Sequence, residues 1–193
     1  MIGGDVSFRP AALSSDHIVL VALLGMSLAL NVYLAGTLYL GIGRVRPSRP
    51  GFQKGEMLGK LVVHDRMGQR QELAFAENKQ TVMYVLRPTC GWCKRNSRAV
   101  KELYTRVSSE YGFVALSLEE NGLQEFLAES GIPFAAYALA PESASLRTRF
   151  TAVPQTLVLA RGGRIAEIWT GAYGGETKTA IERFFGTSLP SLE

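Results

Sequence analysis

The pattern of hydrophobic and polar positions divides the chain into one long apolar run and a longer region of shorter, alternating patterns. Residues from Ile18 to Ile42 carry no formal charge, and as a helix this run is about 37 Å long. That length spans a bilayer with some tilt and exceeds the apolar part of a signal peptide, which has about 7–15 residues. No small-x-small cleavage pattern follows it. We therefore expect an uncleaved membrane anchor at 18–42 after an N-terminal tail at 1–17.

After the apolar run the sequence becomes basic and then takes on a mixed, globular pattern. The residues at 43–54 combine prolines and glycines with basic side chains, which suits a linker close to anionic headgroups. The remaining residues, 55–193, are enough for one domain with its own core and too few for two ordinary ones. The basic residues of the linker are Arg44, Arg46, Arg49 and Lys54.

Within the predicted domain, short runs rich in β-forming residues alternate with amphipathic stretches. The run from Val82 to Leu86 is almost continuously apolar, which is typical of a strand buried on both faces. The sequence Arg-Gly-Gly at 161–163, between two apolar runs, gives the strongest hairpin signal in the chain. The predicted strands are 61–63, 71–75, 82–86, 113–118, 134–139, 156–160 and 164–169.

Four segments carry helical patterns. In the first, Val100, Leu103, Val107 and Tyr111 recur at helical spacing, and Gly112 is placed to end the helix. Strands that alternate with helices and are followed by a hairpin and a final helix predict an α/β sandwich with a mixed central β-sheet. The other predicted helices are 123–129, with Asn121 as its cap and Gly131 at its end, 142–150 after Pro141, and 177–185.

Charge narrows the possible partners. The net charge of +4 is modest, and part of it lies in the linker. No basic stripe interleaved with aromatic residues appears elsewhere, which argues against a nucleic-acid partner. Arg9 and the α-amino group precede the anchor, whereas three arginines and a lysine follow it, so the positive-inside rule favours a cytoplasmic domain.

The chain has two cysteines, Cys90 and Cys93, so it cannot build a disulfide framework. Thiols spaced i, i+3 are able to close a tight disulfide. If Cys90 begins the helix that follows strand 82–86, unpaired N–H groups and the helix dipole favour its thiolate, the form that attacks a disulfide. Cys93 then lies one turn further on the same face. We expect Cys90 to be the nucleophile and Cys93 the resolving cysteine.

Three residues next to the cysteines bear on the same chemistry. Lys94 adds positive charge that favours a thiolate, or it is an ordinary solvated helix residue. We expect Gly91, like Lys94, to help stabilise the thiolate, because a glycine lets the chain turn tightly at the start of the helix. Trp92 either shields the cysteines and contacts a client, or it packs as part of the core.

The order of these features resembles the thioredoxin superfamily over about residues 55–186. It runs from a strand through the CxxC motif at 90–93, a long helix and a βαβ-like insert to Val153-Pro154, a hairpin and a final helix. The anchor and the long interval before Pro154 are similar to the membrane-tethered TlpA/ResA and redoxin branch. The resemblance implies a thioredoxin-like fold with a cis Pro154 that faces the two sulfurs. It also implies that the backbone of Val153 pairs with a bound client chain.

The sequence departs from the pattern of that superfamily in two places. Thr89 stands where an aromatic residue usually precedes the first cysteine, which changes one rim of the site. Tyr84 lies in the strand that often holds a buried acid, so the proton acceptor for Cys93 is left open. Glu119 and Glu120 are candidates for that acceptor, or they form a solvated pair in a loop.

Three other functions compete with disulfide exchange. A zinc site needs about four ligands, and His64 is the one other soft ligand in the domain. A redoxin-like thiol peroxidase, an antioxidant enzyme, fits Pro88-Thr89 ahead of the attacking cysteine, although Arg87 stands where such enzymes usually have Thr. A redox-inert adaptor, or a partner in metal or haem delivery, would use the fold for binding alone.

The resulting hypothesis is a membrane-anchored thiol:disulfide oxidoreductase. Because electrons pass through sulfur, it implies no dissociable cofactor and no metal. The expected partners are protein thiols and disulfides, an electron donor that the sequence leaves unidentified, and a membrane bound through 18–42. Disulfides persist in oxidising compartments, which favours a periplasmic domain, on the side opposite to the one that the flanking charges favour.

Overall fold

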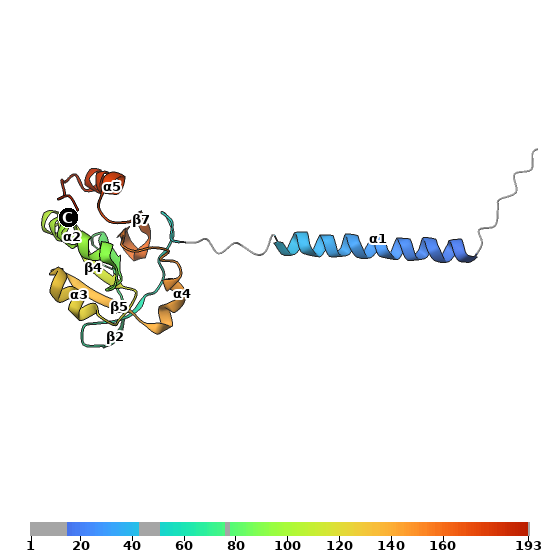
Figure 1. Cartoon of the computed structure of the whole chain (residues 1–193), viewed down its shortest axis with the longest axis horizontal. Helices are drawn as coiled ribbons and strands as arrows, with labels where there is room; N and C mark the ends of the chain where they lie inside the picture. The colour runs from blue at the N-terminus through green and yellow to red at the C-terminus, as the bar shows by residue number, and fades with distance from the viewer. Residues whose placement is uncertain (1–14, 43–50, 76–77, 193) are drawn as a thin grey trace, which may run out of the picture. The chain divides into compact units, whose positions relative to one another are not determined.

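The described part of the chain consists of one helix and one globular unit. The helix α1 spans Ser15–Ile42, and the globular unit lies within Arg49–Glu193. The predicted tail at 1–17 and linker at 43–54 fall largely outside the described residues. The computed structural model, shown in Figure 1, describes residues 15–42, 51–75 and 78–192.

Helix α1 contains the predicted anchor. Its segment Asp16–Thr37 is long and apolar enough to cross a membrane, with a mean hydropathy of 2.3 in its most apolar window. The side chain of Asn31 donates a hydrogen bond to the carbonyl of Ser27 at 2.7 Å. This polar group is therefore satisfied along the backbone of its own helix, which reduces the cost of placing it in an apolar medium.

The globular unit is built on one mixed sheet. In the described residues its seven strands follow the order β2-β1-β5-β4-β3-β6-β7. Strand β4 is parallel to β3 and β5, whereas β6 is antiparallel to β3 and β7, and β1 is antiparallel to β2 and β5. The strands are β1 (Val62–His64), β2 (Arg70–Glu72), β3 (Thr81–Leu86), β4 (Gly112–Ser117), β5 (Ala135–Leu139), β6 (Gln155–Leu159) and β7 (Ile165–Thr170).

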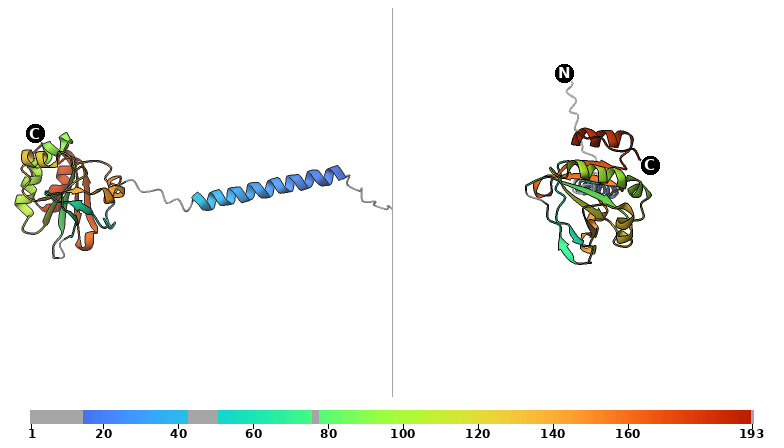
Figure 2. Two further views of the ribbon diagram at one scale, coloured as in Figure 1. Left: turned by 90° about the horizontal axis from the view of Figure 1, so that it is seen from below. Right: turned by 90° about the vertical axis from the view of Figure 1, so that its left-hand side faces the viewer.

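The helices pack on this sheet. Figure 2 shows α2 in green and α5 in red near one another, and residues of both helices and of α3 belong to one core cluster. The helical segments of the unit are α2 (Gly91–Val107), α3 (Leu123–Ser130), the 3-10 turn η1 (Pro141–Ser143), α4 (Ala144–Arg147), the 3-10 turn η2 (Arg161–Gly163) and α5 (Gly175–Phe185).

Strand β3 is buried along its whole length because both faces of the sheet are covered. Tyr84 and Leu86 point into the cluster that contains α2, α3 and α5. Met83 and Val85 point into a second cluster, which also contains the side chain of Phe150. The nearly continuous apolar pattern of this strand is thus explained by its central place in the sheet.

The structure confirms the predicted α/β class and corrects the first predicted helix. Helix α2 ends at Val107, so it does not continue to Tyr111. The ring of Tyr111 packs edge-on against Phe185, with 5.0 Å between ring centroids. Its apolar character therefore serves a tertiary contact. Gly112 begins β4 opposite Thr81, where a Cβ atom would meet the Thr81 hydroxyl at 3.3 Å.

A second correction concerns the start of α3. The residue that precedes this helix is Gly122, with φ of 78°, so Asn121 is not its cap. That positive φ favours glycine. The predicted end of the helix is confirmed, because Gly131 has φ of 61° and its N–H bonds to the carbonyl of Leu127.

Candidate functional site

Cys90 lies at the junction between β3 and α2, as the sequence predicts. It is the N-cap residue of α2, with extended φ and ψ of −80° and 108°. Its carbonyl accepts hydrogen bonds from the N–H groups of Cys93 at 3.0 Å and Lys94 at 3.2 Å. The N–H of Cys93 also lies 3.2 Å from the Cys90 Sγ atom. A sulfur here takes the place that a hydroxyl or carboxylate oxygen occupies in an ordinary helix cap.

The two cysteines differ sharply in exposure. Both are free thiols, and Cys90 is half-buried while Cys93 is buried, with 0% of its surface exposed. An incoming molecule therefore meets the sulfur of Cys90 first. Cys90 is therefore the accessible sulfur of the pair, and Cys93 is the enclosed one.

The environment of Cys93 favours the neutral thiol. Burial raises its pKa far above the ordinary thiol value, and the hydrogen bond and charge of Cys90 raise it further. A backbone hydrogen bond from Arg87 and the hydroxyl of Tyr84 act in the opposite direction. Desolvation disfavours the charged form of any buried acid, so Cys93 keeps its proton until another group compensates the charge.

A loop on the far side of Cys90 carries the predicted proline. The peptide bond between Val153 and Pro154 is cis, as the resemblance implies. The thiol of Cys90 donates to the carbonyl of Val153 at 3.7 Å. Next to this contact lies a mainly apolar pocket of about 280 Å³, lined by Trp92, Val153, Pro154, Gly171, Ala172 and Leu192.

Trp92 and Lys94 lie on the outer surface of α2. The side chain of Trp92 is 54% exposed, and the guanidinium of Arg95 lies 4.6 Å from the centre of its ring. Trp92 is therefore a surface residue that borders the pocket, not a core residue. The ammonium of Lys94 forms an ion pair with Glu129, so part of its positive charge is compensated.

The structure shows no need for a glycine at the second position of the motif. Gly91 is the first residue of α2 and does not have a positive φ. A Cβ atom at this position would meet no atom within 4 Å. The tight turn that the sequence suggested therefore does not require a glycine here.

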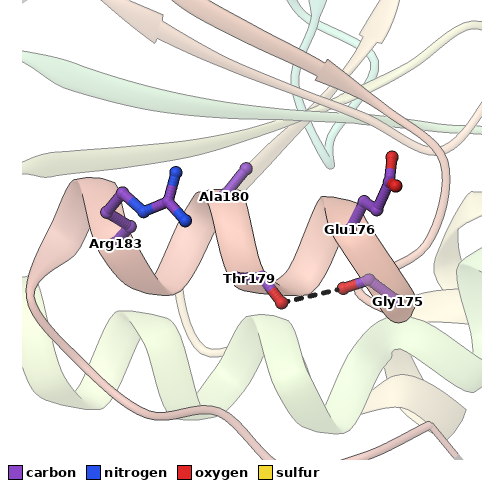
Figure 3. Close-up of a pocket in the computed structure, with 5 residues that line it drawn as sticks. All are labelled: Gly175, Glu176, Thr179, Ala180 and Arg183. Carbon is purple, nitrogen blue, oxygen red and sulfur yellow. Dashed lines mark hydrogen bonds between the residues drawn. The ribbon is translucent and has the colours of Figure 1, made fainter.

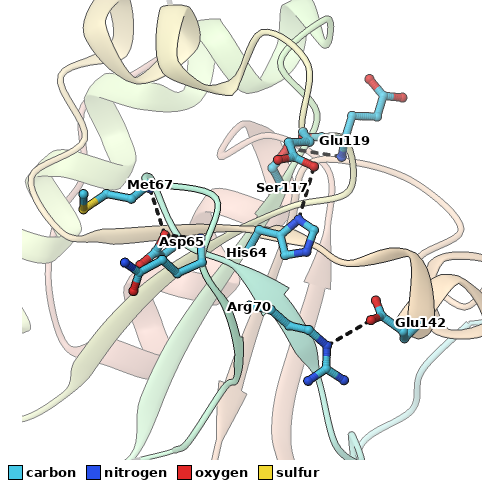
Figure 4. Close-up of polar contacts among 9 residues, drawn as sticks. His64, Asp65, Met67, Arg70, Ser117, Glu119 and Glu142 are labelled. Atoms are coloured by element: carbon cyan, nitrogen blue, oxygen red, sulfur yellow. Dashed lines mark hydrogen bonds and ion pairs between the residues drawn. The ribbon is translucent and has the colours of Figure 1, made fainter.

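The two candidate carboxylates are engaged elsewhere. Glu119 lies 3.7 Å from the Arg87 guanidinium, and Glu120 lies 3.2 Å from the imidazole of His64. Figure 4 shows His64 at the end of β1, with the turn from Ser117 to Glu119 opposite it. Neither carboxylate is among the groups that shift the pKa of Cys93. The structure therefore agrees with a solvated loop pair.

Beneath Cys93 the structure contains a polar network that sequence reasoning missed. The hydroxyl of Tyr84 donates to the Cys93 carbonyl at 3.4 Å and accepts from the Asn96 amide at 3.4 Å. The oxygen of Asn96 accepts the N–H of Tyr173 at 2.8 Å, and the hydroxyls of Tyr173 and Thr156 lie 2.8 Å apart. The signal in the sequence was one polar residue, Asn96, on the apolar stripe of α2.

A groove on α5 lies outside this site. It has a volume of about 600 Å³ and is lined by residues of α5 alone. Figure 3 shows its lining, in which the Thr179 hydroxyl donates to the carbonyl of Gly175 at 3.2 Å. It contains neither cysteine.

Among the described residues, no group of three or more His, Cys, Asp or Glu side chains is placed to hold a metal ion.

Comparison with solved structures identifies the fold. The thioredoxin domain of a thiol-disulfide oxidoreductase from Bacteroides vulgatus has a TM-score of 0.59 and 13% identity, covering 70% of this chain and 99% of that domain. The thiol:disulfide interchange protein DsbE from Chlorobium tepidum has a TM-score of 0.59 and 14% identity, covering 70% and 98%. A thio-disulfide isomerase from Thermus thermophilus has a TM-score of 0.50 and 19% identity, covering 72% and 100%.

These similarities establish that the chain has a thioredoxin-like fold, and at that level the resemblance seen in the sequence is confirmed. No protein-family model and no curated protein sequence matches the chain. Sequence identities this low establish a shared fold and do not transfer an activity.

Proposed function

We propose that this protein is a membrane-anchored thiol:disulfide oxidoreductase that exchanges disulfides with protein clients. One observation carries the proposal: a half-buried sulfur at a helix N-cap lies between a buried second thiol and the carbonyl of Val153. A surface sulfur for attack, an inner sulfur for resolution and a backbone acceptor for a bound chain are the three parts that disulfide exchange needs.

The first step takes place at the surface. The sulfur of Cys90 attacks one sulfur of a client disulfide, and the second client sulfur leaves with the bonding electrons. The N–H of Cys93, which points at Cys90 Sγ from 3.2 Å, favours negative charge on the attacking sulfur. The pocket beside Pro154 provides room for a side chain next to the client cysteine.

The second step takes place inside the motif. The sulfur of Cys93 attacks Cys90, closing a disulfide between residues three apart and releasing the client as a dithiol. The same steps in reverse oxidise a client dithiol. The electron donor that would return the pair to its reduced form is outside this chain and is not specified by it.

Trapping tests the proposal. Full-length protein in detergent carrying Cys93→Ser should form a stable mixed disulfide with insulin, visible as a reducible adduct on a gel. Cys90→Ser is the matched control and should form none. An adduct with both variants, or with neither, would contradict the assigned roles. If the wild-type protein also consumes hydrogen peroxide quickly while reacting slowly with insulin, a peroxidase replaces the proposal.

We also propose that α1 anchors the protein in a membrane with the domain on the oxidising side. The length and hydropathy of α1 support the anchor, and the persistence of disulfides in oxidising compartments supports the orientation. Protease added to intact spheroplasts should digest the domain. Digestion only after lysis would place the domain in the cytoplasm, as the positive-inside rule predicts.

A further inference from the structure

The hydroxyl of Tyr84 bonds to the backbone of Cys93 and to the polar network beneath it. Among the described residues, no other hydroxyl side chain makes both contacts. Tyr84 is 1% exposed and lies on β3, on the face that packs against α2. Its hydroxyl donates to the Cys93 carbonyl at 3.4 Å. Its hydrogen bond also lowers the pKa of the Cys93 thiol, opposing the effect of burial. The hydroxyl therefore bonds to the backbone of Cys93 and also favours the ionised form of its sulfur.

The surrounding contacts fix the position of this hydroxyl. The amide of Asn96 donates to the Tyr84 oxygen at 3.4 Å, so the hydroxyl hydrogen is left to point towards Cys93. Asn96 in turn is held by the N–H of Tyr173 at 2.8 Å, and Tyr173 is held by Thr156 at 2.8 Å. All four side chains are buried, so water does not compete for these bonds.

Burial also determines what Tyr84 is able to do. Desolvation, together with the nearby Cys93 thiol, raises the pKa of the phenol well above its ordinary value. Tyr84 therefore keeps its proton at neutral pH and acts as a donor, not as a base. The carboxylates Glu119 and Glu120 are paired with Arg87 and His64 and do not affect the Cys93 thiol, whereas the neutral hydroxyl of Tyr84 does.

We propose that the Tyr84 hydroxyl assists the resolving step by turning from the carbonyl of Cys93 to its sulfur when that sulfur becomes negatively charged. This inference rests on the proposed function and adds a residue to it. A hydrogen bond to a charged acceptor is about twice as strong as one to a neutral acceptor. The bond is therefore strengthened in the transition state, which is the condition for accelerating a step.

The resolving step balances without any other reactant. In the mixed disulfide, the Cys93 thiol loses its proton and its sulfur bonds to the sulfur of Cys90. The bond between Cys90 and the client breaks, and the client sulfur leaves with the electron pair. The client thiolate takes up the proton that Cys93 lost. Tyr84 is neither oxidised nor deprotonated.

A chromogenic aryl disulfide, dithiobisnitrobenzoate, separates the two steps in one experiment. In the reduced full-length protein, attack by Cys90 on this reagent releases the first coloured thiolate. Resolution by Cys93 releases the second. For Tyr84→Phe, stopped-flow absorbance should show an unchanged first phase and a second phase slowed by about 10-fold to 100-fold, the range for a lost hydrogen bond to a charged group. A first-phase rate equal to that of the wild type shows that the surroundings of Cys90 are unchanged.

Tyr173→Phe is the matched control, because it removes a buried hydroxyl from the same network without removing a contact to Cys93. Both phases should be nearly unchanged in that variant, because the backbone N–H of Tyr173 that holds Asn96 is retained. Equal slowing of the second phase by both substitutions would show that Tyr84 only supports the structure of the network, which would overturn the inference. An unchanged second phase in Tyr84→Phe would overturn it as well.

A second variant keeps the hydroxyl in place if Tyr84→Phe fails to fold. Site-specific Tyr84→fluorotyrosine is a stronger donor of nearly the same shape, and it should accelerate the second phase. No acceleration counts against the inference. Failure of the proposed function would look different, since the wild-type protein would then release one coloured thiolate or none.

Discussion

The two sulfurs of this protein are three residues apart and lie in opposite environments. Around Cys90 the surface is open: the sulfur caps a helix, Trp92 is exposed beside it, and a small apolar pocket adjoins Pro154. Cys93 is itself fully buried, and the buried side chains of Tyr84 and Asn96 connect it to a hydrogen-bond network. The outer region is suited to contact with other molecules. The inner region is suited to holding one thiol in a fixed place.

The comparison shows how one turn of helix separates two tasks. Each residue advances the chain by about 100° around the helix axis, so a cap residue and the residue three positions later share a face while differing in depth. The first sulfur lies at the N-terminus of α2, beside unpaired N–H groups. The second lies in the core between α2 and the sheet.

Removal of the outer sulfur should cause the largest loss of activity. Cys90→Ser should reduce the release of thiolate from the chromogenic aryl disulfide to the level of the blank, a loss of at least about 100-fold, because a hydroxyl is a far weaker nucleophile than a thiolate. Cys93→Ser should keep the first phase and release one thiolate per chain instead of two. Activity retained by Cys90→Ser would mean that the buried sulfur attacks directly.

The inner network should dominate stability. Asn96→Leu keeps the branched shape of the side chain but leaves the N–H of Tyr173 and the hydroxyl of Tyr84 without this partner. Each buried group left unsatisfied costs about 1–3 kcal/mol, so the urea midpoint should fall by the equivalent of about 2–4 kcal/mol. Ser97→Ala, at the next position on the surface of the same helix, is the control and should be nearly neutral. Similar effects of both substitutions would contradict the proposed importance of the network.

The buried thiol should also make stability depend on pH. Because the pKa of Cys93 is raised in the folded protein, its contribution is intact below the ordinary thiol value of about 8.5 and is lost as the pH rises. Above that pH the unfolded chain releases a proton that the folded protein retains. The free energy of unfolding of the reduced protein should then fall by up to about 1.4 kcal/mol per pH unit.

Denaturant titrations between pH 8 and pH 10 check this slope. Cys93→Ala lacks the group and should show a flatter decline over the same interval. Tyr84 and Tyr173, whose pKa values are also raised by burial, add to the decline only from about pH 10, the ordinary value of a phenol. Equal slopes for the wild type and the Cys93 variant would show that the inner thiol is not held in its neutral form.

The smallest change in stability is expected at the outer surface. Trp92→Ala removes an exposed ring, so the free energy of unfolding should change by less than about 0.5 kcal/mol. Exchange with insulin should slow by about fivefold, because an aromatic surface next to the reacting atom contributes to binding. Met67→Ala is the control, since Met67 is 82% exposed and lies in the turn between β1 and β2. Equal rates for Trp92→Ala and the wild type would remove Trp92 from the client surface.

The sequence contained the outer part of this site more fully than the inner part. The spacing of the cysteines, the strand before them and the helix after them are local patterns, and they correctly placed Cys90 at a helix start. The cis bond before Pro154 came from the resemblance, because most X–Pro bonds are trans and composition alone does not distinguish the two forms.

The inner network depends on contacts between residues far apart in the chain. Asn96 and Tyr173 are separated by 77 positions, and neither residue belongs to a motif. Tertiary packing also explains the error at the end of α2, where Tyr111 continues the apolar stripe although it packs against Phe185 outside the helix. Hydrophobic spacing reports that a side chain is buried, but not which element buries it.

The most direct test of the division between the two cysteines is a competition within one molecule. The reduced full-length protein is treated with less than one equivalent of N-ethylmaleimide at neutral pH, digested and mapped by mass spectrometry. The account predicts that almost all of the label lies on Cys90, because Cys93 is fully buried and held in its neutral form. Label shared equally between the two cysteines, or concentrated on Cys93, would contradict it.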